Sequence, residues 1–257
     1  MKISTIFLYD EPAVPEINIS RLVEFLKQTF FVKVELRKNI FSFANNSITK
    51  KIASCRIFNS RKPFEKHEPS YDEIIFEEAN VIDSSNTKNI ILYDGYELQK
   101  IITKLIPSNE LSLDQFHVIF TNKLTCTYDQ NDFRYHGRAL IGSNPSIIST
   151  TGIIEAPAKP REYYFDLISK LTQGLNINSV KRKYRGTYLE YHDERLAPIT
   201  EGYLLQALFY YITGEPFCES RDCRLFNAHW QNDLIHSQLQ VGKLCNKHQH
   251  ILNNFSE

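Results

Sequence analysis

The stretch ITEGYLLQALFYYIT occupies residues 199–213, and Gly214 follows it. On an α-helix, the apolar side chains of this stretch cover nearly all faces, and the glycine provides a C-terminal stop. A helix that is apolar all round is normally buried at the centre of a domain. We therefore predict a central helix over residues 199–213, against which the rest of the chain packs.

Two pairs of metal-binding residue types follow this helix. Cys218 and Cys223 are separated by four residues, Cys245 and His248 by two, and 21 residues lie between the pairs. A tetrahedral zinc site takes four nitrogen or sulfur ligands, usually as two close pairs, because each tight turn presents two ligands to one ion. The spacing predicts one Zn²⁺ per chain. Its role would be structural, because four protein ligands leave no open position for water or substrate.

Several alternatives stay open for these residues. His250 could replace His248 as the fourth ligand, and His229 is a weaker substitute. Cys218 and Cys223 could instead form a disulfide, or the cysteines could be buried thiols that bind no metal. The other two cysteines have no partner at ligand spacing, so we expect them to pack as small hydrophobes.

The composition limits the classes of partner. The chain has 257 residues, 42% of them hydrophobic and 23% charged, with a formal net charge of zero, which is typical of a soluble globular protein without a general attraction to nucleic acids or anionic membranes. The basic run Lys181–Arg185 is interpreted as a solvated turn or edge strand. No apolar stretch approaches the roughly 18 residues that span a bilayer, and the N-terminus shows no secretory signal. We expect a cytoplasmic protein without nucleic-acid or membrane partners.

Strand and helix patterns alternate upstream of the central helix. An apolar strand is predicted over residues 3–9, then a helix that begins near Asn18 or Ser20 and runs through Leu26, then an alternating strand over 30–36. This order predicts a parallel crossover unit. Further strands are predicted at 89–93, 116–121, 135–142 and 145–154, and further helices at 44–60, 97–106, 163–171, 230–240 and 246–254.

Together these patterns predict an α/β fold. Residues 1–198 would form a mixed β-sheet with flanking helices, and residues 199–257 would form the central helix and a helical, zinc-tied C-terminal portion. We expect one compact unit, because the central helix should pack on the sheet.

The C-terminal part resembles the archaemetzincins, a family of zinc metallopeptidases with a zincin-like fold. Their signature is a helix carrying HExxHxxGxxH, followed by CxxxxCxM and then by CxxC. Gly214 falls on the glycine of the helix motif, and Cys218 and Cys223 match the next pair. Cys245 matches the third cysteine, and His248 stands where the fourth would be.

The catalytic positions of that signature are altered in this chain. The three histidine positions hold Ala207, Tyr211 and Phe217, and the glutamate position holds Leu208. In such enzymes the helical histidines hold the ion, and the glutamate activates its water. The resemblance therefore implies a metallopeptidase homologue that has lost its catalytic centre and binds peptide or protein instead of cutting it.

Over a longer span, the chain resembles an uncharacterised archaeal family catalogued as metallopeptidases. The runs at residues 135–138, 149–160 and 223–230 carry this resemblance. In such peptidases an edge strand beside the active-site helix pairs with extended substrate, and residues Ile147–Ile154 could provide that edge. The favoured interpretation is an ordinary core strand, because the segment is densely apolar.

Two further hypotheses stay open. An active peptidase could use a relocated metal site, for which His136, Glu155, His192 and Glu194 are weak candidates because they combine imidazoles with carboxylates. Alternatively, the chain is a structural or regulatory interaction module without a small-molecule site. The number of zinc ions separates the active peptidase from the homologue that has lost its catalytic centre, because a second, removable ion would indicate an enzyme.

Overall fold

A five-stranded sheet forms the centre of the protein. The computed structural model describes residues 2–63, 65–82 and 90–256. The strands of this sheet are β1 (Thr5–Tyr9), β2 (Lys33–Arg37), β4 (Gln115–Thr121), β7 (Leu140–Ile141) and β8 (Ser146–Ser149). Their order is β2-β1-β4-β8-β7; β7 runs antiparallel to β8, and the other neighbours are parallel. The predicted mixed sheet and the parallel β1–β2 crossover are confirmed.

A smaller sheet lies beside the first. Its three strands are β3 (Leu92–Asp94), β5 (Leu124–Asp129) and β6 (Arg134–Arg138). β5 and β6 form an antiparallel hairpin in which Thr127 pairs with His136 and Thr125 pairs with Arg138. Paired residues and residues two apart share a face of a sheet, so Thr127 and Arg138 lie on the same side of this hairpin.

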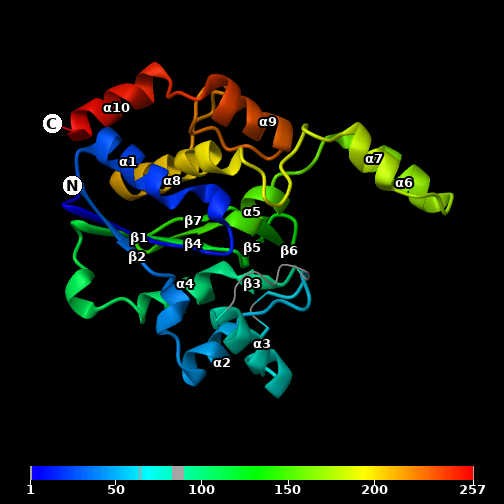
Figure 1. Cartoon of the computed structure of the whole chain (residues 1–257), viewed down its shortest axis with the longest axis horizontal. Coiled ribbons are helices and arrows are strands. Elements are labelled where there is room, and N and C mark those ends of the chain that lie inside the picture. The colour runs from blue at the N-terminus through cyan, green and yellow to red at the C-terminus, as the bar shows by residue number, and fades with distance from the viewer. Residues whose placement is uncertain (1, 64, 83–89, 257) are drawn as a thin grey trace.

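Helices cover both faces of the five-stranded sheet (Figure 1). One face carries α1 (Ile19–Phe30), α8 (Leu196–Thr213), α9 (Gln231–Ile235) and α10 (Asn246–Ser256). The other face carries α2 (Asn46–Ser54), α3 (Tyr71–Ile82) and α4 (Gly95–Thr103). The remaining helices are α5 (Thr150–Glu155), α6 (Arg161–Thr172), α7 (Asn178–Lys183), the short 3-10 turns η1 (Pro15–Ile17), η2 (Ile40–Phe43) and η3 (Ser108–Glu110), and the π-helix η4 (His236–Val241).

The predicted central helix is α8, which begins at Leu196. Its side chains join a hydrophobic cluster that also contains sheet residues such as Phe116 and Ile148. Gly214 ends the helix with a φ of +79°, a left-handed conformation that glycine adopts without steric cost. Within the described ranges, none of the helices combines the length and the apolar character that a membrane crossing requires.

The segment predicted as a strand over 145–154 is a strand only to Ser149. The Ser149 hydroxyl accepts a hydrogen bond from Gly152 N and caps α5, so the chain turns into a helix at that point. β8 lies between β4 and β7 and is therefore no edge. The suggestion that Ile147–Ile154 provides an edge strand for peptide is wrong; the edge on this side is β7.

Other predictions need smaller corrections. α1 continues to Phe30, so its following strand begins only at Lys33. α2 is shorter than the predicted 44–60, because Asn45 caps its start and Cys55 ends it. α4 begins two residues before Glu97, because Asp94 caps it with its carboxylate. α3, α7 and β5 were not predicted, and the predicted strand at 89–93 begins at Leu92 in the structure, with part of the prediction outside the described residues.

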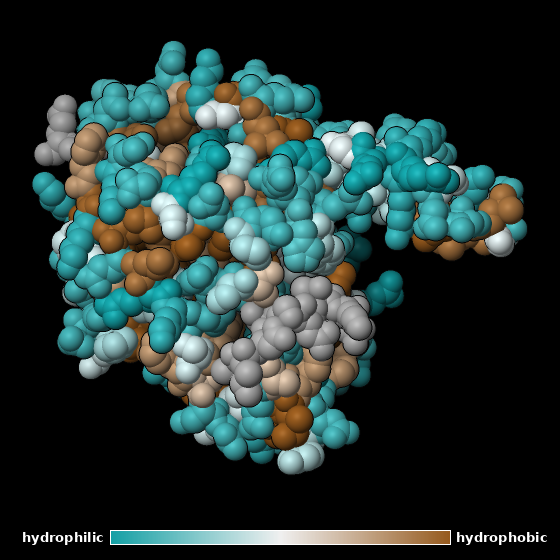
Figure 2. All heavy atoms as spheres, viewed as in Figure 1, coloured by the Kyte–Doolittle hydropathy of each residue, from teal (hydrophilic) through white to brown (hydrophobic). Residues whose placement is uncertain are grey.

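α6 and α7 project from the body as an arm (Figure 1). A small cluster of Tyr163, Val180 and Tyr188 holds the arm together, and Figure 2 shows apolar side chains at its far end. In the basic run Lys181–Arg185, the first three residues lie in α7, which Val180 anchors to α6, and the last two lie in the turn that follows. The prediction of a turn is therefore confirmed only in part, and the run is no edge strand.

Candidate metal centre and binding groove

The two predicted ligand pairs meet beyond the carboxyl end of α8. The ligand atoms that lie within 4.8 Å of one another belong to Cys218, Cys223, Cys245 and His248. The Sγ atoms of Cys218 and Cys245 are 4.0 Å apart. Nδ1 of His248 lies 3.6 Å from Sγ of Cys223 and 3.1 Å from Sγ of Cys245.

These distances fit the edges of a tetrahedron around one zinc ion. Zinc binds sulfur at about 2.3 Å and nitrogen at about 2.0–2.1 Å, which places two sulfur ligands about 3.8 Å apart and a sulfur and a nitrogen about 3.5 Å apart. The observed separations of 4.0, 3.6 and 3.1 Å scatter around these values. The side chains therefore need only small shifts to hold an ion.

Backbone hydrogen bonds support the ligand loop. Cys218 N donates to Leu225 O at 2.9 Å, which folds the loop back on itself. Ser220 N donates to Sγ of Cys218, and Cys245 N donates to Sγ of Cys223, both at 3.4 Å. Amide donors aimed at sulfur stabilise thiolates, so these bonds favour the metal-binding form of both cysteines.

The proton affinities of the ligands follow from their surroundings. Burial raises the pKa of the Cys223 thiol to about 12. Burial also opposes a thiolate at Cys245, but hydrogen bonds that include the backbone N–H groups of His248 and Lys247 outweigh it and lower the pKa of that thiol. Burial lowers the pKa of His248, so its imidazole is neutral and can bind a metal through Nδ1.

The alternative fourth ligands lie outside the group of four. His250 is exposed on α10 and lies 3.2 Å from the amide of Asn254, away from the thiols. His229 lies in the wall of a separate groove. All five cysteines are free thiols, so no disulfide joins Cys218 to Cys223. The other two cysteines are buried as small hydrophobes, as predicted.

A buried ion pair ties the ligand loop to α8. Arg224, which follows the ligand Cys223, donates to Oε2 of Glu201 at 2.9 Å, and Arg21 donates to Oε1 of the same carboxylate at 2.7 Å. Arg224 also donates to the carbonyl of Pro198. The loop that carries two ligands is thereby held against the first turns of the central helix.

α8 itself has no catalytic metal ligands. It contains no histidine, and its one carboxylate, Glu201, is occupied by the two arginines. Ala207 and Leu208 are fully buried in the core. The Tyr211 ring stacks on Phe116, and its hydroxyl donates to the carbonyl of Leu113. The helix therefore lacks the histidines and the free glutamate that hold the ion and activate its water in the peptidase signature.

The four candidates for a relocated site are not brought together. His192 is largely exposed and pairs with Glu16 at 2.9 Å. His136 of β6 contacts Asp132 of the β5–β6 turn at 2.7 Å, and Asp129 at the end of β5 completes a group of three ligand atoms. Glu155 faces Lys159 at the end of α5, and Glu194 is exposed. Among the described residues, no group of three ligand atoms includes two of these four candidates.

A groove of about 480 Å³ separates α8 from the β6–β7 edge. This volume lies within the roughly 300–1,000 Å³ that ligand pockets occupy. Gln206 of α8 is 2% exposed, its Nε2 donates to Phe226 O at 3.3 Å, and its Oε1 has no hydrogen-bond partner. The groove is walled by Tyr203, Gln206 and Tyr210 of α8, by 138–142 of the β6–β7 edge, and by Phe217 and 227–229 of the ligand loop.

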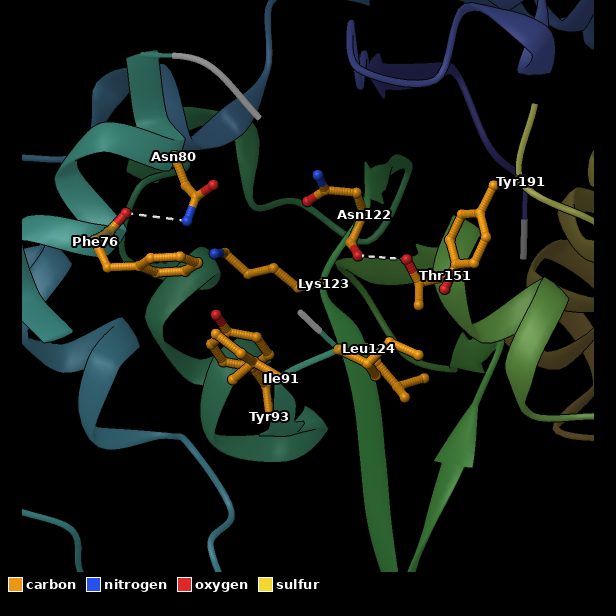
Figure 3. A pocket seen from close by; sticks show the side chains of 10 residues that line it. Phe76, Asn80, Ile91, Tyr93, Asn122, Lys123, Leu124, Thr151 and Tyr191 are labelled. Atoms are coloured by element: carbon orange, nitrogen blue, oxygen red, sulfur yellow. Dashed lines mark hydrogen bonds between the residues drawn. The ribbon is translucent and has the colours of Figure 1, made fainter. Parts of the chain in front are cut away.

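Two other cavities are weaker candidates. A pocket of about 40 Å³ beside Lys123 is too small for a substrate (Figure 3). In Figure 3 the Lys123 amine points between the rings of Phe76 and Tyr93. A cavity of about 660 Å³ adjoins the loop after α2, but its two most buried charged groups are already paired: Asp94 caps α4 and accepts from Tyr135, and Arg56 binds carboxylates of α3.

A family model covers nearly the whole chain. The model of the probable metallopeptidase family (DUF6775) matches residues 2–255. The chain belongs to this family. It is also similar to the crystal structure of a zinc-dependent peptidase from Methanocorpusculum labreanum (strain Z), at 11% identity and a TM-score of 0.41, with 97% of this chain and 100% of that chain covered. No curated protein matches the chain.

Sequence reasoning missed the groove. The helix face that lines it carries Tyr203, Gln206 and Tyr210, whereas the motif alignment had pointed to Ala207 and Tyr211. Polar side chains at 203, 206 and 210 follow helical spacing within an otherwise apolar helix, and that pattern was a usable signal.

Proposed function

We propose that this protein is a zinc-stabilised relative of the archaemetzincin-like metallopeptidases that binds peptide in the groove beside α8 and does not hydrolyse it. The observation that carries the proposal is the pairing of a complete Cys3His ligand set with a central helix that has no metal ligand available. A peptidase of this class needs an ion and a base on that helix.

The groove supports the binding half of the proposal. It lies between a helix and the antiparallel edge strand β7, which offers an unpaired backbone edge to an extended segment. Its wall includes the exposed aromatic residues Tyr210 and Phe217, and aromatic side chains dominate recognition surfaces.

Metal analysis of the purified chain tests the proposal that one zinc ion stabilises the fold. We expect one zinc ion per chain, removable only with loss of the fold. The Cys223→Ser variant should lose the ion and melt at a markedly lower temperature, because the remaining ligands cannot close a tetrahedral site. Cys55→Ser, which also replaces a buried thiol, is the matched control and should keep its zinc.

A pool of peptides tests the proposal that the groove binds peptide without hydrolysing it. The holoprotein should bind fluorescein-labelled pentapeptides randomised at the last two positions, and mass spectrometry should find them uncut. Cleavage together with a second ion that chelators remove without unfolding would restore the enzyme hypothesis and end this proposal.

A further inference from the structure

We propose that the groove selects peptides by their free C-terminal carboxylate, with Arg138 as the carboxylate-binding residue. This inference rests on the proposed function, because it names the class of peptide that the same groove takes. It follows from the charges and the unpaired polar atoms of the groove wall.

Arg138 supplies a positive charge that the protein does not neutralise. Its Nε donates to the hydroxyl of Thr127 at 2.7 Å, which fixes the side chain on the groove side of the β5–β6 hairpin. Across the described ranges, no carboxylate lies within ion-pair distance of this guanidinium, and no Asp or Glu lines the groove. Two terminal nitrogens remain for a ligand, and a guanidinium binds a carboxylate through paired N–H donors.

Gln206 supplies the complementary acceptor. Its Oε1 is buried without a donor, and leaving such an atom unpaired costs free energy that a ligand N–H would recover. The Nε2 bond to Phe226 O sets the amide orientation. Oε1 is buried in the groove wall, so a ligand N–H reaches it when the side chain turns toward the groove. A peptide carries both missing groups close together, because its backbone N–H lies near its terminal carboxylate.

The rest of the wall favours an apolar last residue. Tyr203, Tyr210 and Phe217 present ring surfaces to the groove. Burying an apolar side chain against them is favourable by roughly 25 cal/mol per Å² of apolar surface removed from water. The ligand that satisfies all three features is a peptide that ends in an apolar or aromatic residue with a free carboxyl group.

The test compares two pools of fluorescein-labelled pentapeptides, randomised at the last two positions and ending in either a free acid or an amide. Fluorescence polarisation with the zinc-loaded chain should show the acid pool binding at least tenfold more tightly. Arg138→Gln should lower acid binding to the level of the amide and leave amide binding unchanged. Arg161→Gln, which removes an arginine that stacks on Trp230 outside the groove, is the control and should change neither.

The outcomes separate this inference from the proposed function. If both pools bind equally well, the carboxylate inference is overturned and peptide binding stands. If Arg138→Gln lowers the affinity for both pools equally, Arg138 supports the groove wall without binding the carboxylate, and the inference again fails. If neither pool binds at millimolar concentration, the proposed function itself is wrong.

Discussion

The carboxylate of Glu77 shows how one residue organises the face opposite the metal centre. It is 1% exposed and accepts from Arg56 at 2.7 Å, from the hydroxyl of Tyr93 at 2.7 Å and from Nζ of Lys123 at 2.6 Å. Nζ of Lys123 also lies 4.8 Å from the centre of the Tyr93 ring. A single acidic side chain of α3 therefore connects the loop after α2, the strand β3 and the β4–β5 turn.

Replacing this carboxylate should be costly. Glu77→Gln leaves Lys123 buried without its counter-charge and leaves Arg56 with Glu73 alone. Breaking a buried pair in this way costs about 3–5 kcal/mol. Urea unfolding at pH 7 measures the change. Glu97→Gln, which breaks an exposed pair with Lys100, should change stability by less than about 0.5 kcal/mol. Equal effects from the two variants would contradict the assignment.

The pKa of Glu77 also determines the direction in which the stability of the protein changes with pH. Burial alone would raise the pKa of Glu77, but its bonds to Lys123, Tyr93 and Arg56 hold the pKa below its ordinary value of 4.5. Its stabilisation is therefore complete above about pH 4.5 and is lost as the pH falls through the lower folded-state value. The stability gap between the wild type and Glu77→Gln should narrow below pH 4.5.

At the scale of elements, the junction of β8 and α5 depends on one glycine. A Cβ on Gly152 would lie 2.2 Å from the carbonyl oxygen of Arg138, a backbone atom that cannot move aside. Alanine otherwise stabilises a helix by about 1 kcal/mol relative to glycine. A loss of stability in the alanine variant would therefore come from this contact. Gly152→Ala should lower the melting temperature by several degrees.

Gly137→Ala is the control on the facing strand. There the nearest atom to an added Cβ is a flexible side-chain carbon of Leu124 at 3.4 Å, which is close to an ordinary contact. The variant should melt near the wild-type temperature. A Gly152→Ala protein as stable as Gly137→Ala would mean that α5 packs less closely on β6 than the structure shows.

The elements that sequence predicted well are those whose pattern is local. The apolar runs of β1 and α8 are sufficient to predict these two elements, and the ligand pairs are recognisable from their spacing alone. The end of β8 is not visible in the same way, because β-prone residues continue to Ile154 and only the cap at Ser149 starts the helix. The spacing of the polar side chains on α8 indicated one wall of the groove, but the opposite wall could not be predicted, since Arg138 comes to line it only after the sheets have formed.

At the scale of the whole molecule, the metal centre and the groove share a wall. Phe217 precedes the ligand Cys218, and 227–229 follow Cys223 in the same loop. Removing the ion should therefore disturb the groove, although a peptide bound there would not touch the metal. After chelation, binding of the free-acid peptide pool should fall at least tenfold, measured by polarisation alongside circular dichroism. Undiminished binding by the metal-free chain would show that the wall holds its shape unaided.

That shared loop also implies a reciprocal effect. Whatever factor zinc contributes to the affinity for peptide, peptide must contribute to the affinity for zinc, because linkage between two binding equilibria is symmetric. A cell short of zinc would leave the chain both less folded and less able to capture its partner, whereas an abundant partner would protect the ion from competing chelators.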